Sequence, residues 1–359
     1  MFSKQRKKAL TIKEMNDLLN YCYKYRYIIN GPKPKGEPFK LYAYVEDKET
    51  LFSLSVKIGT KACTYVCRKD KDEVMFGATG MEAFSILSRY YKIKDFRDDE
   101  MCKKLLAYDD EENGSGSNKF LVSASPVMYK NEKYEGTRNK AIGYDLNSSY
   151  SNAMLKPIPD TSVPYHSGIV KAGEIGFKED ENGHLVPVFE NHFSYFIFPL
   201  MDSPFTKFVN NWYKKKKNAK NPADKKKAKD VLNFCIGYMQ KTNPFIRAKI
   251  IYEANKMISD LIDENTLYCN TDSIVSLTER KDIKLGNNIG QFKIEHQGEF
   301  AYIGFNYQWN RDVPSYRSIQ KSAFKKGYDM LKDPLPARGS GNIVKYNENT
   351  YRLEKIKWN

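Results

Sequence analysis

Two aspartates stand where a predicted β-strand gives way to a turn. Asp272 lies in "LYCNTDSIV", residues 267–275, between two short apolar runs that predict the strands of a hairpin. Asp145 ends the apolar run in "KAIGYDLNSSYSNAML", residues 140–155, and a turn is expected after it. Carboxylates held at such turns are hard oxygen ligands for Mg²⁺. Aspartate is also an ordinary turn residue, so each of the two taken alone allows both a metal site and a plain turn.

A second set of polar residues is spaced for one face of a helix. Lys225, Lys229, Asn233 and Gly237 follow one another at intervals of four residues in a segment with helical periodicity. A solvated lysine face is one interpretation. Asparagine and glycine are poor helix formers, however, and a glycine in mid-helix often marks the close approach of another group. The stripe therefore favours a phosphate-bearing ligand that lies across the helix.

The elements that would position these residues read as a mixed α+β chain. Residues 1–110 predict helices at 12–25 and 81–92 and strands at 39–46 and 61–68, and "DDEENGSGSNK" at 109–119 predicts a linker. Several short strands are expected in 165–200. Three helices follow, each with a capping residue before a proline in its first turn. The caps and prolines are Asp202 or Ser203 with Pro204, Asn221 with Pro222, and Asn243 with Pro244.

Composition limits the setting and the partners. The 359 residues contain no run of about 18 apolar residues that would span a membrane, and no apolar run follows the basic N-terminus as in a secretory signal. Six scattered cysteines argue against a zinc site and favour a reducing, cytoplasmic location, which is the host cytoplasm if the protein is viral. The formal charge of +15 fits either a well-solvated surface or a polyanionic partner such as nucleic acid.

Three segments, in this order, resemble motifs A, B and C of family B DNA polymerases. They are "YDLNSSYSNAML", "KDVLNFCIGYM" and "YCNTDSIV", against the family patterns D-x-x-S-L-Y-P-S, K-x-x-x-N-S-x-Y-G and Y-x-D-T-D-S. The likeness covers about residues 140–310. The small size and the β-rich segment between motifs A and B are most similar to the protein-primed branch of phages and linear plasmids.

The resemblance implies an enzyme, a DNA-directed DNA polymerase that replicates a phage or plasmid-like genome. Its metal site would hold two Mg²⁺ ions, which Mn²⁺ could replace, on the catalytic carboxylates of Asp145 and Asp272 and the carbonyl of Leu146. The expected partners are a DNA template-primer and dNTPs, with a terminal protein or other replication factors as further candidates and no membrane. The resemblance assigns dNTP binding to Ser148, Tyr150, Lys225, Lys229 and Asn233, and DNA binding to Gly237, Thr271, Tyr307 and Lys321.

Several positions depart from the family patterns. Asn270 replaces the first aspartate of motif C and removes a negative charge from the site. Two changes in motif B alter the expected contact with the nascent base pair, and the family's K-x-Y element aligns with "FNY", which keeps Tyr307 without its lysine. Arg317 or Lys321 could substitute for that lysine. The two changed positions of motif B are Phe234 and Ile236. In motif A, Ser151 replaces the proline of the family pattern.

The resemblance also implies a division into domains. It predicts a palm from residues 136–200 and 242–309, fingers from 201–241 and a small thumb from 310–359, arranged as a right hand. Residues 1–135 would form a separate α+β domain. They lack an Asp-x-Glu with later acidic partners, so no proofreading exonuclease is expected there.

The sequence therefore allows two functions, of which we expect the first. The first is an active polymerase, which the joint presence of Asp145, Asp272, Tyr150, Lys229 and Asn233 favours. The alternative is a polymerase-like module that binds nucleic acid with reduced catalysis, which Asn270, Ile236 and the altered K-x-Y element favour.

Overall fold

The structure is a computed structural model whose chain divides into two compact units. The first consists of Met1–Arg89, Asn210–Cys235 and Arg338–Asn359, and the second of Tyr90–Val209 and Ile236–Ala337. The described residues are 10–11, 39–47, 51–58, 61–68, 73–77, 80–105, 126–310 without 182 and 221, 316–317, 329–332, 342–347 and 350–355. The helix predicted at 12–25 and the linker predicted at 109–119 lie outside them. Among the described residues, no helix is long and apolar enough to cross a membrane.

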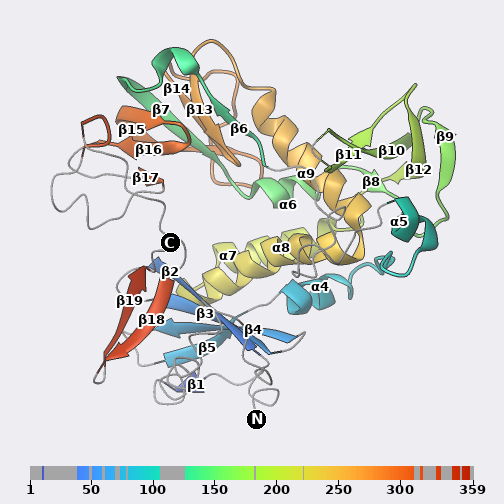
Figure 1. The fold of residues 1–359 in the computed structure, drawn as a ribbon, viewed down its shortest axis with the longest axis horizontal. Helices are drawn as coiled ribbons and strands as arrows, with labels where there is room; N and C mark the ends of the chain where they lie inside the picture. Colours follow the sequence, from blue (N-terminus) through green and yellow to red (C-terminus); the bar gives the residue numbers. More distant parts are fainter. Residues whose placement is uncertain are drawn as a thin grey trace. The chain divides into compact units, whose positions relative to one another are not determined.

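The first unit contains a seven-stranded antiparallel sheet (Figure 1). In spatial order its strands are β1 (Leu10–Thr11), β5 (Glu73–Gly77), β4 (Lys61–Arg68), β3 (Leu51–Ile58), β2 (Phe39–Asp47), β18 (Asn342–Asn347) and β19 (Thr350–Lys355). The strands predicted at 39–46 and 61–68 are confirmed as β2 and β4. The last two strands come from the C-terminal region and join the sheet through β18, in which Asn342 pairs with Ala43 of β2.

A second seven-stranded antiparallel sheet carries both aspartates and lies in the second unit. Its order is β17 (Tyr316–Arg317), β16 (Asn306–Trp309), β15 (Phe292–Ile303), β7 (Arg138–Leu146), β14 (Ser273–Ser276), β13 (Thr266–Asn270) and β6 (Met128–Lys130). We call it the carboxylate sheet. The short helix α6 (Ser149–Ala153) follows β7. The predicted hairpin at 267–275 is confirmed as β13 and β14.

The two faces of the carboxylate sheet have different coverings. On one face Tyr144, Leu146 and Ile274 pack with Ile258 of helix α9 (Pro244–Ser259). The other face carries an aromatic cluster of Tyr268, Phe300, Tyr302 and Trp309. Successive side chains of a strand point to opposite faces. Asp145, between Tyr144 and Leu146, therefore projects from the face that α9 does not cover.

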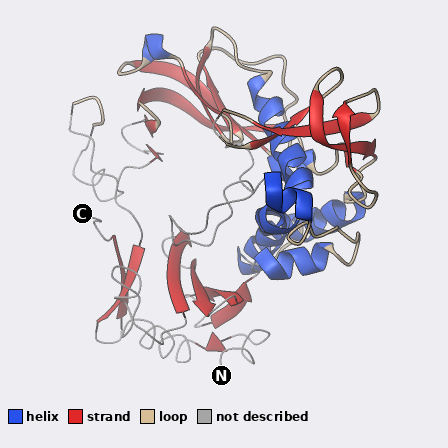
Figure 2. Cartoon of the chain, turned by 45° about the vertical axis from the view of Figure 1, so that its right-hand side comes forward, coloured by secondary structure: helices blue, strands red, loops and turns tan. Residues whose placement is uncertain are grey.

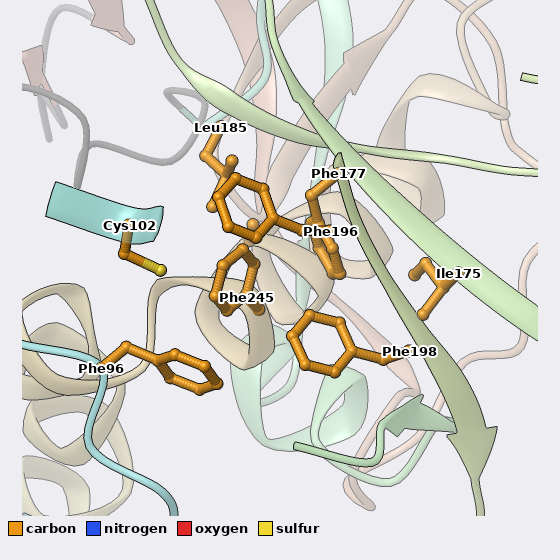
Figure 3. Packing of buried hydrophobic residues seen from close by; sticks show 9 residues of the cluster. Phe96, Cys102, Ile175, Phe177, Leu185, Phe196, Phe198 and Phe245 are labelled. Carbon is orange, nitrogen blue, oxygen red and sulfur yellow. The ribbon is translucent and has the colours of Figure 1, made fainter. Parts of the chain in front are cut away.

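The segment between motifs A and B is rich in strands, as predicted for 165–200. Strands β11 (Leu185–Val188), β10 (Glu174–Glu179), β12 (Phe193–Met201) and β8 (Ile158–Pro159) lie in that order, and β9 (His166–Ile169) also pairs with β12. Phe177, Phe196 and Phe198 surround Phe245 from the first turn of α9, with ring centroids 5.0–5.2 Å from it (Figure 3). The adjoining helix α5 (Glu100–Leu105) adds Cys102 to this core.

The three helices predicted after residue 200 are confirmed (Figure 2). Helix α8 (Pro222–Thr242) begins at its expected proline, and Asn243 caps α9 by accepting a hydrogen bond from the N–H of Ile246 at 3.1 Å. Helix α7 (Thr206–Lys217) begins later than Pro204, because the Ser203 hydroxyl accepts the N–H of Phe205 in a turn before the helix. The helix predicted at 81–92 is confirmed only in part, since α4 (Gly80–Leu87) gives way to a turn.

Gly143 of β7 is a position where packing excludes a side chain. A Cβ atom there would lie 2.7 Å from the ring of Trp309, which is buried in the aromatic cluster. We expect Gly143→Ala to lower the free energy of unfolding by about 1–3 kcal/mol, as overpacking of a rigid core does. Urea denaturation measures this change. Gly237→Ala is the matched control, because no atom of the described residues beyond the neighbouring backbone of its own helix lies within 4 Å of its Cβ position. We expect that variant to be as stable as the wild type or more so.

Candidate functional site

The two motif aspartates lie at the ends of neighbouring strands of the carboxylate sheet, Asp145 within β7 and Asp272 in the turn before β14. Asp145 pairs in register with Ser273, the residue after Asp272. The N–H of Leu146 donates to the carbonyl of Asp272 at 2.7 Å, which extends the ladder between β7 and β14 into the turn. Backbone pairing therefore brings Asp145 and Asp272 together at one end of β7 and β14, although they are far apart in the sequence.

The turn that carries Asp272 is held tightly. Thr271 has φ of 63°, in the left-handed region that β-branched residues rarely adopt. Its N–H donates to the carbonyl of Val127 at 2.9 Å, and the Ser273 hydroxyl donates to the carbonyl of Asn270 at 3.0 Å. A strained conformation of this kind costs of order 1–3 kcal/mol and persists where its surroundings enforce it, often at functional sites. Thr271, expected to contact DNA, thus shapes the turn that presents Asp272.

A row of polar side chains crosses four strands at the same level. Asn270 of β13 pairs with Ser273 of β14, Ser273 with Asp145 of β7, and Asp145 with Lys293 of β15. The Lys293 Nζ lies 2.9 Å from Asp145 Oδ2. Burial alone would lower the pKa of the Lys293 ammonium, but the hydrogen bond and charge of Asp145, with Glu295 and Asp272, raise it above its usual value. Lys293 could not be selected from the sequence, since only the pairing of β15 with β7 brings it to the site.

Helix α6 brings Tyr150 to the same region. Its start at Ser148 is left-handed, with φ of 58°, which turns the chain sharply after β7. Burial raises the pKa of the Tyr150 hydroxyl, the positive charge of Arg247 opposes that rise and the negative charge of Asp272 adds to it. Tyr150 therefore lies within electrostatic reach of Asp272, as the resemblance requires of a residue near the nucleotide sugar.

Arg247 is a second residue that sequence reasoning missed. It lies in the first turn of α9, and burial lowers the pKa of its guanidinium. Its Nε and Nη1 atoms are buried and have no hydrogen-bond partner among the residues that the structure describes. An arginine within an otherwise apolar helix start, "NPFIRAKII", was the available signal.

The polar stripe on α8 lies largely at the surface of the helix. Lys225, Lys229 and Gly237 are exposed and Asn233 is half-buried. The predicted apolar face of the same helix is buried and consists of Ala228, Val231, Leu232, Cys235 and Met239. Ile236, which replaces a motif B tyrosine, is 3% exposed and therefore buried. Lys225, Lys229 and Asn233 belong to the first unit, whereas the carboxylates belong to the second.

A lysine-lined cavity lies between the end of α7 and the start of α8. Its volume is about 700 Å³. Lysines outnumber acidic residues in its lining, which makes it a positively charged surface. The ammonium of Lys215 lies 4.0 Å from the centroid of the Trp212 ring in a cation–π contact. The charged lining residues are Lys214, Lys215, Lys220, Asp224 and Lys227.

The last residues expected to contact DNA are Tyr307 and Lys321, with Arg317 as a candidate replacement for the missing lysine of the K-x-Y element. Tyr307 of β16 packs edge-on against Tyr268, with ring centroids 5.7 Å apart, and lies 5.8 Å from Phe300. Its ring is thus part of the aromatic cluster. Backbone pairing sets Arg317 opposite Tyr307. Lys321 lies outside the described residues.

The donor set at the carboxylate sheet suits a hard divalent cation. Within the described part of the chain, no three His, Cys, Asp or Glu residues converge as a protein cage for a metal. Two neighbouring carboxylates are nevertheless what Mg²⁺ commonly uses, because it keeps several waters and takes its other ligands from substrate phosphates. Asp145 and Asp272 therefore fit such an ion, and they fit one that arrives with a phosphate-bearing substrate.

Comparisons with known proteins point in the same direction. No family model matches the chain. It is 25% identical over 324 residues to a DNA polymerase of Acidianus bottle-shaped virus (isolate Italy/Pozzuoli), in an alignment that covers 77% of this chain and 47% of that protein. The chain thus spans about half the length of this relative. The match confirms the resemblance to DNA polymerases that the three motifs predicted.

Solved structures of phi29 DNA polymerase are also similar. The ternary complex with primer-template DNA and incoming nucleotide substrates has a TM-score of 0.49 and 13% identity, covering 77% of this chain and 66% of that one. The complex with single-stranded DNA has a TM-score of 0.48 and 13% identity, covering 70% of this chain and 61% of that one.

Proposed function

We propose that this chain is a DNA-directed DNA polymerase of the family B type that extends a primer by nucleotidyl transfer. The observation that carries the proposal is the pairing of β7 with β14, which sets Asp145 beside the turn of Asp272. The sequence match to a viral DNA polymerase supports it. The test is primer extension on a primed single-stranded template, with Mg²⁺ or Mn²⁺ and with dNTPs or rNTPs. Incorporation that requires the metal and dNTPs is expected.

The residues of the second unit would hold and orient the reacting groups. Asp145 and Asp272, with the carbonyl of Leu146, would hold two Mg²⁺ ions. When bound, these ions supply charge stabilisation to the attacking 3′-oxygen and the leaving pyrophosphate. Ser148 would contact the nucleotide at the start of α6, and Tyr150 would lie under its sugar.

The residues of α8 would hold the rest of the substrate. Lys225 and Lys229 would bind the triphosphate, since exposed ammonium groups neutralise phosphate charge, and Asn233 would lie near it. Gly237 would let the nascent base pair approach the helix. Thr271, Tyr307 and Lys321 would contact the primer-template. In this assignment residues 136–200 and 242–309 are the palm, 201–241 the fingers, 310–359 the thumb and 1–135 a domain without an exonuclease site.

The proposed biological role is replication of a phage or plasmid-like genome, with a terminal protein as one candidate source of the primer hydroxyl. The second candidate function is a polymerase-like module that binds nucleic acid with reduced catalysis. Asn270 and Lys293 favour it, because both lower the negative charge around Asp145. Salt-sensitive DNA binding without extension, either from a DNA primer or from a supplied protein primer, would support the module.

Tyr150 is expected to select deoxyribonucleotides. Replacing it with alanine would remove the ring that leaves no room for a 2′-hydroxyl, so we expect the ratio of ribonucleotide to deoxyribonucleotide incorporation to rise at least about tenfold. Single-nucleotide extension with dCTP and with CTP measures the ratio. Tyr150→Phe keeps the ring and is the matched control, in which the wild-type ratio is expected. An unchanged ratio in Tyr150→Ala would place the sugar elsewhere.

A further inference from the structure

Lys293 is fixed beside Asp145 by the backbone. The pair Lys293–Asp145 lies between the register pairs Phe292–Leu146 and Ile294–Tyr144 in the ladder of β15 and β7. Both side chains therefore project from the same face of the carboxylate sheet. The ammonium lies 2.9 Å from Asp145 and 3.7 Å from Glu295, so two carboxylates are within its reach.

This placement changes the charge that a metal ion would meet. Asp145 and Asp272 supply two negative charges, and Lys293 offsets one of them. On the other side of Asp145, two strands away in the same row, Asn270 is neutral where motif C of the family has an aspartate. The charges of Asp145, Asp272 and Lys293 therefore sum to −1, whereas the two aspartates alone would present −2 to a divalent cation.

We propose that Lys293 is an internal counter-cation that competes with the divalent metal for Asp145 and thereby sets the metal affinity of the site. The proposal rests on the proposed function, in which Asp145 and Asp272 hold the metal. Without metal, the ammonium keeps the carboxylate of Asp145 aligned and limits its repulsion from Asp272. When a metal binds, the ammonium turns to Glu295, which is already within 3.7 Å, so no movement of β15 is needed.

A plain cross-strand ion pair is the competing explanation. Both partners are partly exposed, with 41% of the Lys293 side chain and 22% of the Asp145 side chain accessible, and such pairs contribute about 0–1 kcal/mol to stability. A purely structural pair predicts a small loss of stability on substitution and no change in metal affinity. Lys293 is in either case a positioning residue, because it acts through Asp145.

Mn²⁺ binding to the full chain without DNA separates the two explanations. The free Mn²⁺ signal in electron paramagnetic resonance gives the dissociation constant directly. We expect Lys293→Gln to bind Mn²⁺ about tenfold more tightly than the wild type, since removal of one nearby charge in a partly solvated site has an effect of this order. Lys293→Arg keeps the charge and is expected to stay within about twofold of the wild type. Mn²⁺ should also raise the Tm of Lys293→Gln more than that of the wild type.

The outcomes keep this inference apart from the proposed function. Equal Mn²⁺ affinity in Lys293→Gln and wild type, together with loss of binding in Asp145→Asn and Asp272→Asn, would overturn the role of Lys293 and leave the metal site standing. Equal binding by the wild type and both aspartate variants would overturn the metal site itself. Lys293→Met, which keeps the aliphatic stem, serves as the second uncharged variant if Lys293→Gln does not fold.

Discussion

Replacing Asp145 or Asp272 with asparagine is expected to lower the rate of primer extension at least about 10³-fold. Asparagine keeps the size of aspartate but removes the charge that would hold a metal ion. Metal ions contribute several kcal/mol to transition states of phosphoryl transfer, which corresponds to a factor of this size. The measurement is the single-turnover rate of incorporation of one dNTP on a primed template in Mg²⁺.

The two substitutions should act as one. Because both carboxylates would serve the same metal ions, we expect the double variant to be little slower than either single variant. Asp260→Asn is the matched control: this aspartate is exposed at the end of α9, pairs with Lys256 and should keep wild-type activity. Full activity in Asp272→Asn, with folding unchanged, would contradict the assignment of Asp272 as a metal ligand. The segment "YCNTDSIV" would then be an ordinary hairpin turn.

Local features of the carboxylate sheet and its helices were predictable because short stretches of sequence determine them. The hairpin at 267–275 followed from two apolar runs around a polar turn, and β13 and β14 confirm it. The start of α9 followed from Asn243 and Pro244, and the cap is formed. The stripe on α8 followed from a spacing of four residues, and Lys225 and Lys229 are exposed on it. In each case the deciding contacts lie within a few residues of one another.

Long-range pairings were not predictable in the same way. Lys293 reaches Asp145 only because β15 lies beside β7, which no periodicity in the sequence indicates. Arg247 reaches the neighbourhood of Tyr150 only because α9 folds back against α6. The pairing of β18 with β2 is of the same kind, since it joins the C-terminal region to the N-terminal sheet. The identities of these residues were visible, but their neighbours depended on the topology.

The structure also changes the interpretation of Ile236 in motif B and of Tyr307 in the altered K-x-Y element. Ile236 is only 3% exposed, so its replacement of a tyrosine concerns packing at least as much as contact with substrate. Tyr307 packs within the aromatic cluster on the carboxylate sheet, which gives it a structural role whether or not it touches DNA. Asn270 remains the departure with the most direct chemical consequence, because it lies in the same row as Asp145.

Replacing Lys229 with alanine is expected to raise the KM for dNTPs about 10- to 100-fold and to leave the affinity for primer-template nearly unchanged. A hydrogen bond to a charged group contributes about 1.5–3 kcal/mol, and each 1.4 kcal/mol is tenfold in affinity. Lys229 is exposed on α8, so its ammonium is available to a phosphate. Steady-state extension at varied dNTP concentration, with template affinity from anisotropy, gives both quantities.

Two controls make this prediction specific. Lys256→Ala removes an equally basic, exposed side chain from α9, where it pairs with Asp260, and should change neither quantity. Lys225→Ala, one turn before Lys229 on the same stripe, should raise the KM by a smaller factor. The contrary result is an unchanged KM in Lys229→Ala together with a slope of log affinity for DNA against log salt concentration that is smaller by about one. It would show that the stripe binds the DNA backbone instead. The stripe would then bind the template strand, and the triphosphate would have to be held by other cations. Arg247, within electrostatic reach of Tyr150, is a candidate, because its Nε and Nη1 atoms are buried without a hydrogen-bond partner among the described residues.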